Sequence, residues 1–224
     1  MGIDVFSGYG MSETCPVLTL AQLRSEELDL ATEDQLYYRC KAGRAVPMVE
    51  LRVVDSDMND VPVDGQTTGE VVVRSPWLTQ GYLHDPARSD ELWRGGYLHT
   101  GDLGYLDESG YLRVTDRVKD VIKSGGEWIS SLLLEDIATD HPQVSEAAAI
   151  GVADKKWGER PLVLIVVEDA DFDPTTVLNT LSQAADEGVI SRWAVPERVE
   201  IVDEIPKTSV GKIDKKFLRG QYSD

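Results

Sequence analysis

Two segments in the first half of the sequence carry side chains that could bind a charged, ring-containing ligand. Residues 8–14 read Gly-Tyr-Gly-Met-Ser-Glu-Thr, and residues 99–102 read His-Thr-Gly-Asp. The ring of Tyr9 could stack on a flat ligand, and the carboxylates of Glu13 and Asp102 could hold a hard cation or accept two hydrogen bonds. Each segment taken alone is also typical of an ordinary glycine-containing turn.

Two further segments, in the second half of the sequence, combine glycine with basic residues. Residues 116–130 read Asp-Arg-Val-Lys-Asp-Val-Ile-Lys-Ser-Gly-Gly-Glu-Trp-Ile-Ser, and residues 205–215 read Ile-Pro-Lys-Thr-Ser-Val-Gly-Lys-Ile-Asp-Lys. Gly125 and Gly126 have no side chains, so the backbone there could lie close to a narrow ligand. The ammonium of Lys212 could stabilise charge between two anions that must approach each other. Taken alone, these segments are also compatible with an exposed turn and a solvated lysine.

The elements that must position these segments divide into a β-rich part and a mixed part. Alternating apolar and polar residues, with turn residues between them, predict strands in the first part at residues 49–54, 69–74 and 110–114. In the second part, a capped amphipathic helix is predicted to begin at Ser130, and Pro174 is predicted to begin another helix. Buried strands are predicted at residues 147–152 and 162–167, and a further strand at residues 198–202. We therefore predict an α+β fold with one domain over residues 1–116 and a second over residues 117–224.

The charge and cysteine content of the chain disfavour several classes of protein. The 22 Lys and Arg residues face 40 Asp and Glu residues, which gives a formal charge of −18 and disfavours binding to nucleic acid or to anionic lipid. No apolar run reaches the ~20 residues that span a bilayer, and the first residues do not resemble a secretion signal. Cys15 and Cys40 lack metal-ligand spacing, so we expect free thiols and a cytoplasmic protein. The three His residues are scattered, so neither a metal centre nor a catalytic triad is predicted.

The order and spacing of the four segments resemble the acyl-adenylating superfamily, which includes acyl-CoA synthetases, adenylation domains of peptide synthetases and beetle luciferases. The resemblance extends from residue 8 to residue 219. It implies that residues 1–116 are the carboxy-terminal portion of a large AMP-binding domain, a β-rich and barrel-like part. Residues 117–224 would be the small mobile domain of such an enzyme. The implied ligands are ATP or AMP, Mg²⁺ and coenzyme A.

The resemblance implies nucleotide-binding roles in the first part of the chain. Tyr9 would stack on adenine, Ser12 would donate a hydrogen bond to phosphate, and Glu13 would be the Mg²⁺ ligand and a catalytic residue. Asp102 would accept hydrogen bonds from both ribose hydroxyls, and Arg117 would bind the ribose or phosphate side of the nucleotide. Ser12 replaces the Thr that is commoner at its position in the superfamily.

In the second part, the resemblance implies residues for two successive reactions. Lys119 would be the hinge about which the small domain rotates. This rotation would allow one site to catalyse two successive reactions. Lys212 would bridge the substrate carboxylate and the α-phosphate while the acyl-adenylate forms. Lys123 would act in the second reaction, formation of the thioester. A narrow tunnel for the pantetheine arm of coenzyme A would be lined by Gly125, Gly126 and Trp128.

The function implied by the resemblance is that of the carboxy-terminal part of an ATP-dependent fatty acyl-CoA ligase. The phosphate loop and the acyl pocket of the superfamily would precede residue 8, so we expect the chain alone to be inactive and to expose apolar surface through which it could self-associate. One alternative is a noncatalytic nucleotide- or acyl-CoA-binding module, or a subunit that completes its site in trans. Another is an adenylation domain that loads a carrier protein.

Overall fold

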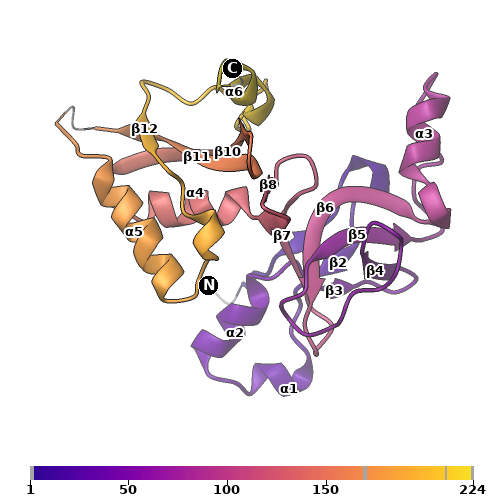
Figure 1. Cartoon of the computed structure of the whole chain (residues 1–224). Helices are drawn as coiled ribbons and strands as arrows, with labels where there is room; N and C mark the ends of the chain where they lie inside the picture. Colours follow the sequence, from indigo (N-terminus) through magenta and orange to yellow (C-terminus); the bar gives the residue numbers. More distant parts are fainter. Residues whose placement is uncertain (1–2, 169–170, 210, 223–224) are drawn as a thin grey trace. The chain divides into compact units, whose positions relative to one another are not determined.

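The computed structural model describes residues 3–168, 171–209 and 211–222 (Figure 1). The contacts within the chain define two compact units, Met1–Val118 and Lys119–Asp224. The division therefore falls after Val118, two residues beyond the boundary placed from the sequence. Each unit has its own hydrophobic core, and each is described by itself.

The first unit begins with a small antiparallel sheet and short helices. The sheet has the strand order β1-β2-β3, formed by Gly8–Tyr9, Thr19–Leu20 and Arg44–Ala45. The helical segments that connect its strands are η1 (Ser12–Thr14), α1 (Ser25–Leu28) and α2 (Thr32–Arg39). The strands are only two residues long, so this sheet serves mainly to fix the ends of the loop that contains η1.

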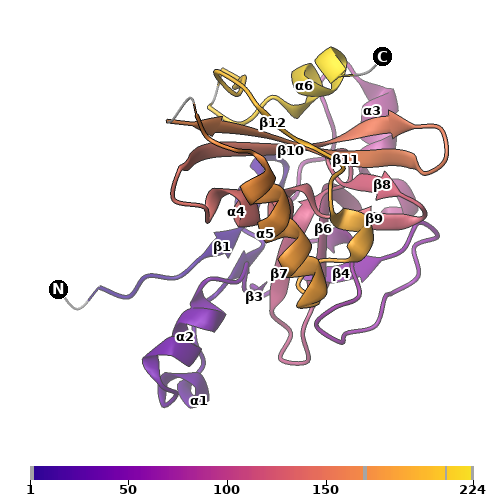
Figure 2. The same ribbon diagram turned by 60° about the vertical axis from the view of Figure 1, so that its left-hand side comes forward.

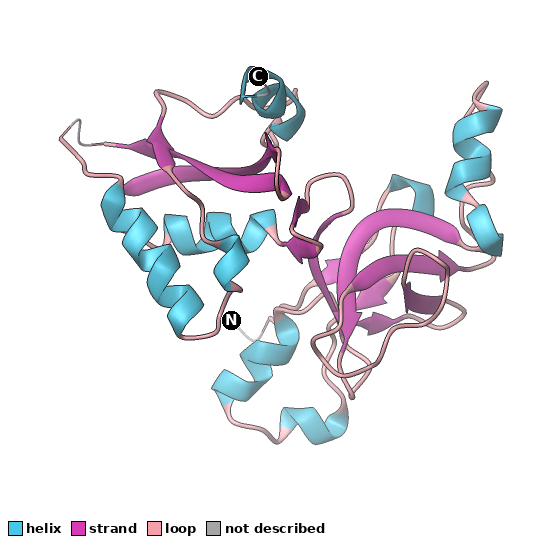
Figure 3. Cartoon of the chain, viewed as in Figure 1, coloured by secondary structure: helices cyan, strands magenta, loops and turns pink. Residues whose placement is uncertain are grey.

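The rest of the first unit is an antiparallel meander in the order β4-β5-β6-β7 (Figure 3). Its strands are Glu50–Val54, Gly69–Arg74, Leu98–Leu106 and Leu112–Arg117, and the β5–β6 connection contains α3 (Pro86–Leu92) and η2 (Arg94–Gly96). One face packs on a core made from Leu18, Val53, Val71, Val73, Leu78, Leu92, Leu98 and Leu112. The pairings of the described strands leave both sheets open, so the expected barrel-like part is built from two open sheets.

The second unit is a mixed sheet with helices on both faces. Strand order is β10-β11-β8-β9, with β12 parallel to β11, and the strands are Ile122–Ser124 (β8), Glu127–Ile129 (β9), Val144–Asp154 (β10), Gly158–Val167 (β11) and Val199–Ile201 (β12). The helical segments are α4 (Ser131–Thr139), α5 (Thr175–Asp186), η3 (Arg192–Ala194) and α6 (Lys215–Tyr222). Helices α4 and α5 lie on one side of β10 and β11, and α6 lies on the other (Figure 2).

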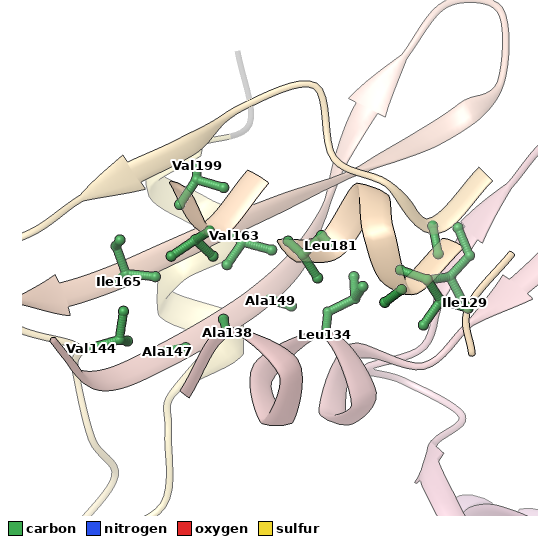
Figure 4. Close-up of a cluster of buried hydrophobic side chains, with 14 of the residues drawn as sticks. Ile129, Leu134, Ala138, Val144, Ala147, Ala149, Val163, Ile165, Leu181 and Val199 are labelled. Atoms are coloured by element: carbon green, nitrogen blue, oxygen red, sulfur yellow. The ribbon is translucent and has the colours of Figure 1, made fainter. Parts of the chain in front are cut away.

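The alternation of residues along β10 and β11 explains why both faces are covered. Ala147, Ala149 and Val163 point into the core shared with α4 and α5 (Figure 4), whereas Ala148 and Leu164 belong to the core beneath α6. Successive side chains of a strand point to opposite faces, so a continuous apolar run must be covered twice. The prediction of an α+β chain with buried strands here is confirmed.

Two smaller expectations can be compared with the structure directly. The side chain of Ser130 caps α4 by accepting a hydrogen bond from the backbone N–H of Leu133, as the sequence predicted. Cys15 and Cys40 are free and exposed, which confirms the expected thiols. Among the residues that the structure describes, none of the helices has the length and apolar content that crossing a membrane would require.

Candidate active site

Tyr9 and Asp102 lie side by side in the first unit, although 93 residues separate them in the sequence. The hydroxyl of Tyr9, on β1, donates a hydrogen bond of 2.6 Å to Oδ2 of Asp102, on β6. Burial is the main cause that raises the pKa of Tyr9 above its usual value, and the negative charge of Asp102 is the second. The hydroxyl therefore stays protonated and acts as a donor. The structure thus joins the first two of the segments singled out in the sequence.

Asp102 is fixed by contacts with the two strands that flank β6, which are β5 and β7. Its backbone N–H donates to Oγ1 of Thr100 (3.1 Å), and the Thr100 hydroxyl donates to the carbonyl of Val71 (2.7 Å). On the neighbouring strand β7, Arg117 lies opposite Asp102 in the register, and its Nε lies 3.3 Å from Asp102 Oδ1. A third segment therefore contributes to the same cluster.

The Asp102 carboxylate keeps capacity for further hydrogen bonds. Tyr9 occupies one acceptor position on Oδ2, and Arg117 lies beside Oδ1. An ionised carboxylate has about four lone-pair positions, so each oxygen can accept another donor. The side chain is 12% exposed, which leaves a narrow access for a ligand. This arrangement suits a ligand that presents two neighbouring hydroxyl groups.

The loop that carries Ser12 and Glu13 depends on Gly10. A Cβ atom at this position would lie 1.7 Å from the carbonyl oxygen of Pro16, so any larger residue would displace the backbone. The buried Thr14 closes the loop, because its hydroxyl donates toward the carbonyls of Met11 and Pro16 while its oxygen accepts the N–H of Met11. Ser12 is exposed at the start of η1.

Glu13 is held at both ends by a segment that sequence reasoning did not select. The hydroxyl of Tyr82 donates to Glu13 Oε1 at 2.8 Å, and the backbone N–H of Thr79 donates to the Glu13 carbonyl at 2.9 Å. Burial, followed by the hydrogen bond to Glu13, raises the pKa of Tyr82. No signal in the sequence identifies Tyr82, because a single Tyr 69 residues away indicates a partner only once the chain has folded.

Glu13 offers a single carboxylate to a metal ion. Within the described part of the chain, no group of three or more His, Cys, Asp and Glu side chains is placed to hold one. Mg²⁺ is commonly bound by one or two carboxylates, with phosphate oxygens of the substrate and water completing its octahedral shell. The single carboxylate fits that mode of binding and does not fit an all-protein metal cage.

In the second unit, four of the residues predicted from the sequence lie on one β-hairpin. Strands β8 and β9 are joined by Gly125 and Gly126, whose φ angles of 61° and 89° are both in the left-handed region. Such a two-residue turn requires positive φ twice, which explains the glycine pair. Lys123 lies opposite Trp128, with its Nζ 5.7 Å from the centre of the indole ring, and Trp128 is 49% exposed.

Lys212 is exposed on a tight turn just before α6. The backbone N–H of Thr208 donates to the Lys212 carbonyl (2.7 Å), and the N–H of Lys212 donates to Oγ1 of Thr208 (3.3 Å). Gly211 adopts a φ of 80°, and Lys207 pairs with Ile213 at the base of the turn. Among the described residues, none forms an ion pair with Lys212. The ammonium is therefore presented outward on a turn that its own backbone stabilises.

The remaining predicted residue, Lys119, is exposed and is the first residue of the second unit. Five predicted residues belong to the first unit: Tyr9, Ser12, Glu13, Asp102 and Arg117. The other six belong to the second: Lys119, Lys123, Gly125, Gly126, Trp128 and Lys212. Direct contacts join Tyr9, Asp102 and Arg117 in one unit, and Lys123 and Trp128 in the other.

Comparison with known proteins identifies the family to which this chain belongs. Residues 1–83 match the AMP-binding enzyme family, and residues 133–212 match the AMP-binding enzyme C-terminal domain. A long-chain-fatty-acid–CoA ligase of Thermus thermophilus is 40% identical over all of this chain and 41% of its own length. A 3-methylmercaptopropionyl-CoA ligase of Ruegeria lacuscaerulensis is 41% identical over all of this chain and 40% of its own length.

A solved structure gives the same result for the fold. The o-succinylbenzoate CoA synthetase of Bacillus subtilis, in complex with its acyl-adenylate intermediate, superimposes with a TM-score of 0.80 at 29% identity. The match covers 100% of this chain and 42% of that protein. The chain belongs to the AMP-binding enzyme family. It spans about 40% of the length of the curated relatives that it matches.

Proposed function

We propose that this chain supplies the carboxy-terminal part of an ATP-dependent fatty acyl-CoA ligase. The observation that carries the proposal is the contact of Tyr9 and Arg117 with an Asp102 carboxylate that retains acceptor capacity. A ribose presents two adjacent hydroxyls, which is the donor pattern that this carboxylate suits. The ligases among the relatives named above support the reaction class, and the Thermus thermophilus protein supports a fatty acid as substrate.

In the proposed reaction, the acid is first joined to AMP. Its carboxylate attacks the α-phosphorus of ATP, and pyrophosphate leaves. Tyr9 and Asp102 bind the nucleoside, and Ser12 donates a hydrogen bond to phosphate. Glu13 would hold Mg²⁺, and the ion, when bound, neutralises phosphate charge and orients the leaving group. Lys212 reduces the repulsion between the two anions, because its exposed ammonium can lie between them.

The second step replaces AMP with coenzyme A. The thiolate of coenzyme A attacks the acyl carbonyl of the mixed anhydride, and AMP leaves. The Gly125–Gly126 turn has no side chains to obstruct a narrow pantetheine arm, and the exposed ring of Trp128 can form one wall of its path. Lys123 lies beside that ring. Lys119 is the first residue of the second unit. Rotation about Lys119 would move Lys212 away from the nucleotide and bring this hairpin to the nucleotide in its place.

Binding of AMP to the chain itself tests the nucleotide site. We expect AMP at up to about 10 mM to shift the amide NMR signals of Tyr9, Asp102 and Arg117, a weak affinity because much of the site of a longer relative is not in this chain. Asp102→Asn should weaken this binding at least about tenfold, since it removes a charge-assisted acceptor. The exposed Asp90→Asn is the control and should bind as the wild type does. Absence of shifts, or equal binding by both variants, would overturn the nucleotide site.

The reaction is tested in a chimera that joins the amino-terminal part of the Thermus thermophilus ligase to this chain. Fatty acid, ATP and coenzyme A should yield pyrophosphate and an acyl-CoA, whereas the chain alone should yield neither. Lys212→Ala should abolish pyrophosphate release at unchanged AMP binding. Acyl transfer to a phosphopantetheinyl carrier protein, but not to coenzyme A, would instead favour a carrier-loading domain. A chimera that binds AMP without any turnover would favour the noncatalytic module.

A further inference from the structure

The backbone of the β8–β9 hairpin is tied to β11 by a side chain. Strands β8 and β11 pair where Gly158 lies opposite Ser124. Next to that pair, the carboxylate of Glu159 accepts a hydrogen bond of 2.9 Å from the backbone N–H of Lys123. Glu159 is therefore bonded to the main chain of the hairpin residue that faces Trp128.

Gly151 provides the space in which the Glu159 carboxylate lies. A Cβ atom built at Gly151, on β10, would be 2.5 Å from Glu159 Oε2, the same oxygen that accepts the Lys123 N–H. Glu159 lies opposite Ala153 in the register, so Gly151 is its diagonal neighbour on the same face of the sheet. The absence of a side chain at residue 151 thus lets the carboxylate reach the hairpin.

Arg160 secures the hairpin from another direction. Its guanidinium donates to Oγ of the fully buried Ser124 at 3.3 Å, and to the carbonyls of Trp193 (2.9 Å) and Val195 (3.0 Å). The backbone N–H of Gly125 donates to the carbonyl of Trp157 (2.9 Å). Residues at the start of β11 and just before it therefore contact three consecutive hairpin residues: Lys123, Ser124 and Gly125.

We propose that Glu159 is a positioning residue for thioester formation. It holds the main chain of Lys123, and through it the Gly125–Gly126 turn and Trp128, in the shape that receives the pantetheine arm. Glu159 acts as a hydrogen-bond acceptor toward a backbone group and does not touch the reacting atoms. This inference rests on the function proposed above for the hairpin, and its two predictions are separable from that function.

Hydrogen exchange in the chain itself tests the contact directly. Glu159→Ala removes the acceptor, and Gly151→Ala displaces it without changing Glu159, so both should speed exchange of the Lys123 amide about tenfold. Glu159→Gln should restore protection, because its amide oxygen can accept the same bond. Glu200→Ala and Gly220→Ala, at sites away from the hairpin, are the matched controls and should leave this amide unchanged. Unchanged exchange in Glu159→Ala would overturn the proposal.

The two half-reactions, measured separately in the chimera, test the consequence for activity. Glu159→Ala and Gly151→Ala should lower the rate of acyl transfer to coenzyme A about tenfold and leave pyrophosphate release within about twofold, because Lys212 lies elsewhere in the unit. An equal fall in both rates would indicate a general structural role and overturn the proposal. No change in either rate would also overturn it. If the wild-type chimera forms no thioester, the proposed function fails, while the exchange measurement still decides whether Glu159 holds the hairpin.

Discussion

Replacing Lys215 with Met removes a buried positive charge from the first residue of α6. Lys215 Nζ lies 2.6 Å from Glu135 Oε1 and donates to Ser131 Oγ at 2.7 Å. The side chains of Lys215 and Glu135 are only 8% and 10% exposed. This network joins α6 to α4, and Lys215 follows the Lys212 turn by three residues. Met keeps most of the apolar stem, so the substitution removes chiefly the charge and its hydrogen bonds.

The expected loss follows from the group that is left behind. Removing one partner of a buried ion pair costs about 3–5 kcal/mol, because the other charge stays buried without that partner. Glu135 still accepts the backbone N–H of Ala149 at 2.8 Å, which places the expected loss near the lower limit, at about 3 kcal/mol. For a domain of about 100 residues, this lowers the Tm of the second unit by about 12–24 °C.

Urea unfolding, followed by circular dichroism and by tryptophan fluorescence, measures the effect. The neighbouring exposed residue gives a matched control, Lys216→Met, which should change stability by no more than about 0.5 kcal/mol. The double variant Lys215→Met with Glu135→Gln should recover more than half of the loss, since no charge then remains buried. A Lys215→Met loss below about 1 kcal/mol, or a double variant as unstable as the single one, would refute this reasoning.

Two further predictions concern the first unit and the whole chain. Gly10→Ala should cost about 3 kcal/mol or more and abolish AMP binding, because its Cβ would lie 1.7 Å from the carbonyl oxygen of Pro16; a variant that melts and binds AMP like the wild type would contradict this. Raising NaCl from about 0.05 to 0.5 M should raise the Tm measured by calorimetry, since salt screens the self-repulsion of a chain with a formal charge of −18. A Tm that is constant or lower in salt would show that this repulsion is not significant.

Features encoded within a few residues were predictable from the sequence. The cap of α4 at Ser130 depends on a hydrogen bond to Leu133, three residues away, and the Gly125–Gly126 turn depends on backbone conformations that only glycine adopts readily. The apolar runs of β10 and β11 indicated strands buried on both faces, and the structure confirms them. Alternation predicted the strands of the β-rich part, but the pairing of those strands into two open sheets depends on tertiary contacts.

The motif segments could be recognised in the sequence, whereas the contacts between them could not be predicted from it. Residue types at Tyr9, Asp102 and Arg117 indicated what each side chain could bind. The 2.6 Å bond between Tyr9 and Asp102 requires β1 and β6 to lie together, and the sequence alone does not specify that packing across 93 residues. The pairing of Arg117 with Asp102 likewise depends on the register of β6 and β7, in which a shift of one residue would reverse the faces of the side chains.

The sequence by itself therefore determined the chemical repertoire of this protein: the carboxylates of Glu13 and Asp102, a glycine pair and a lysine turn, each set by local backbone preferences and side-chain chemistry. Only the tertiary structure decided which groups support them. Tyr82 on Glu13, Glu159 on Lys123, and the buried Lys215 are partners across long separations. Such contacts arise because folding stacks distant strands and helices, and a buried polar group must then find its partner wherever the fold places one.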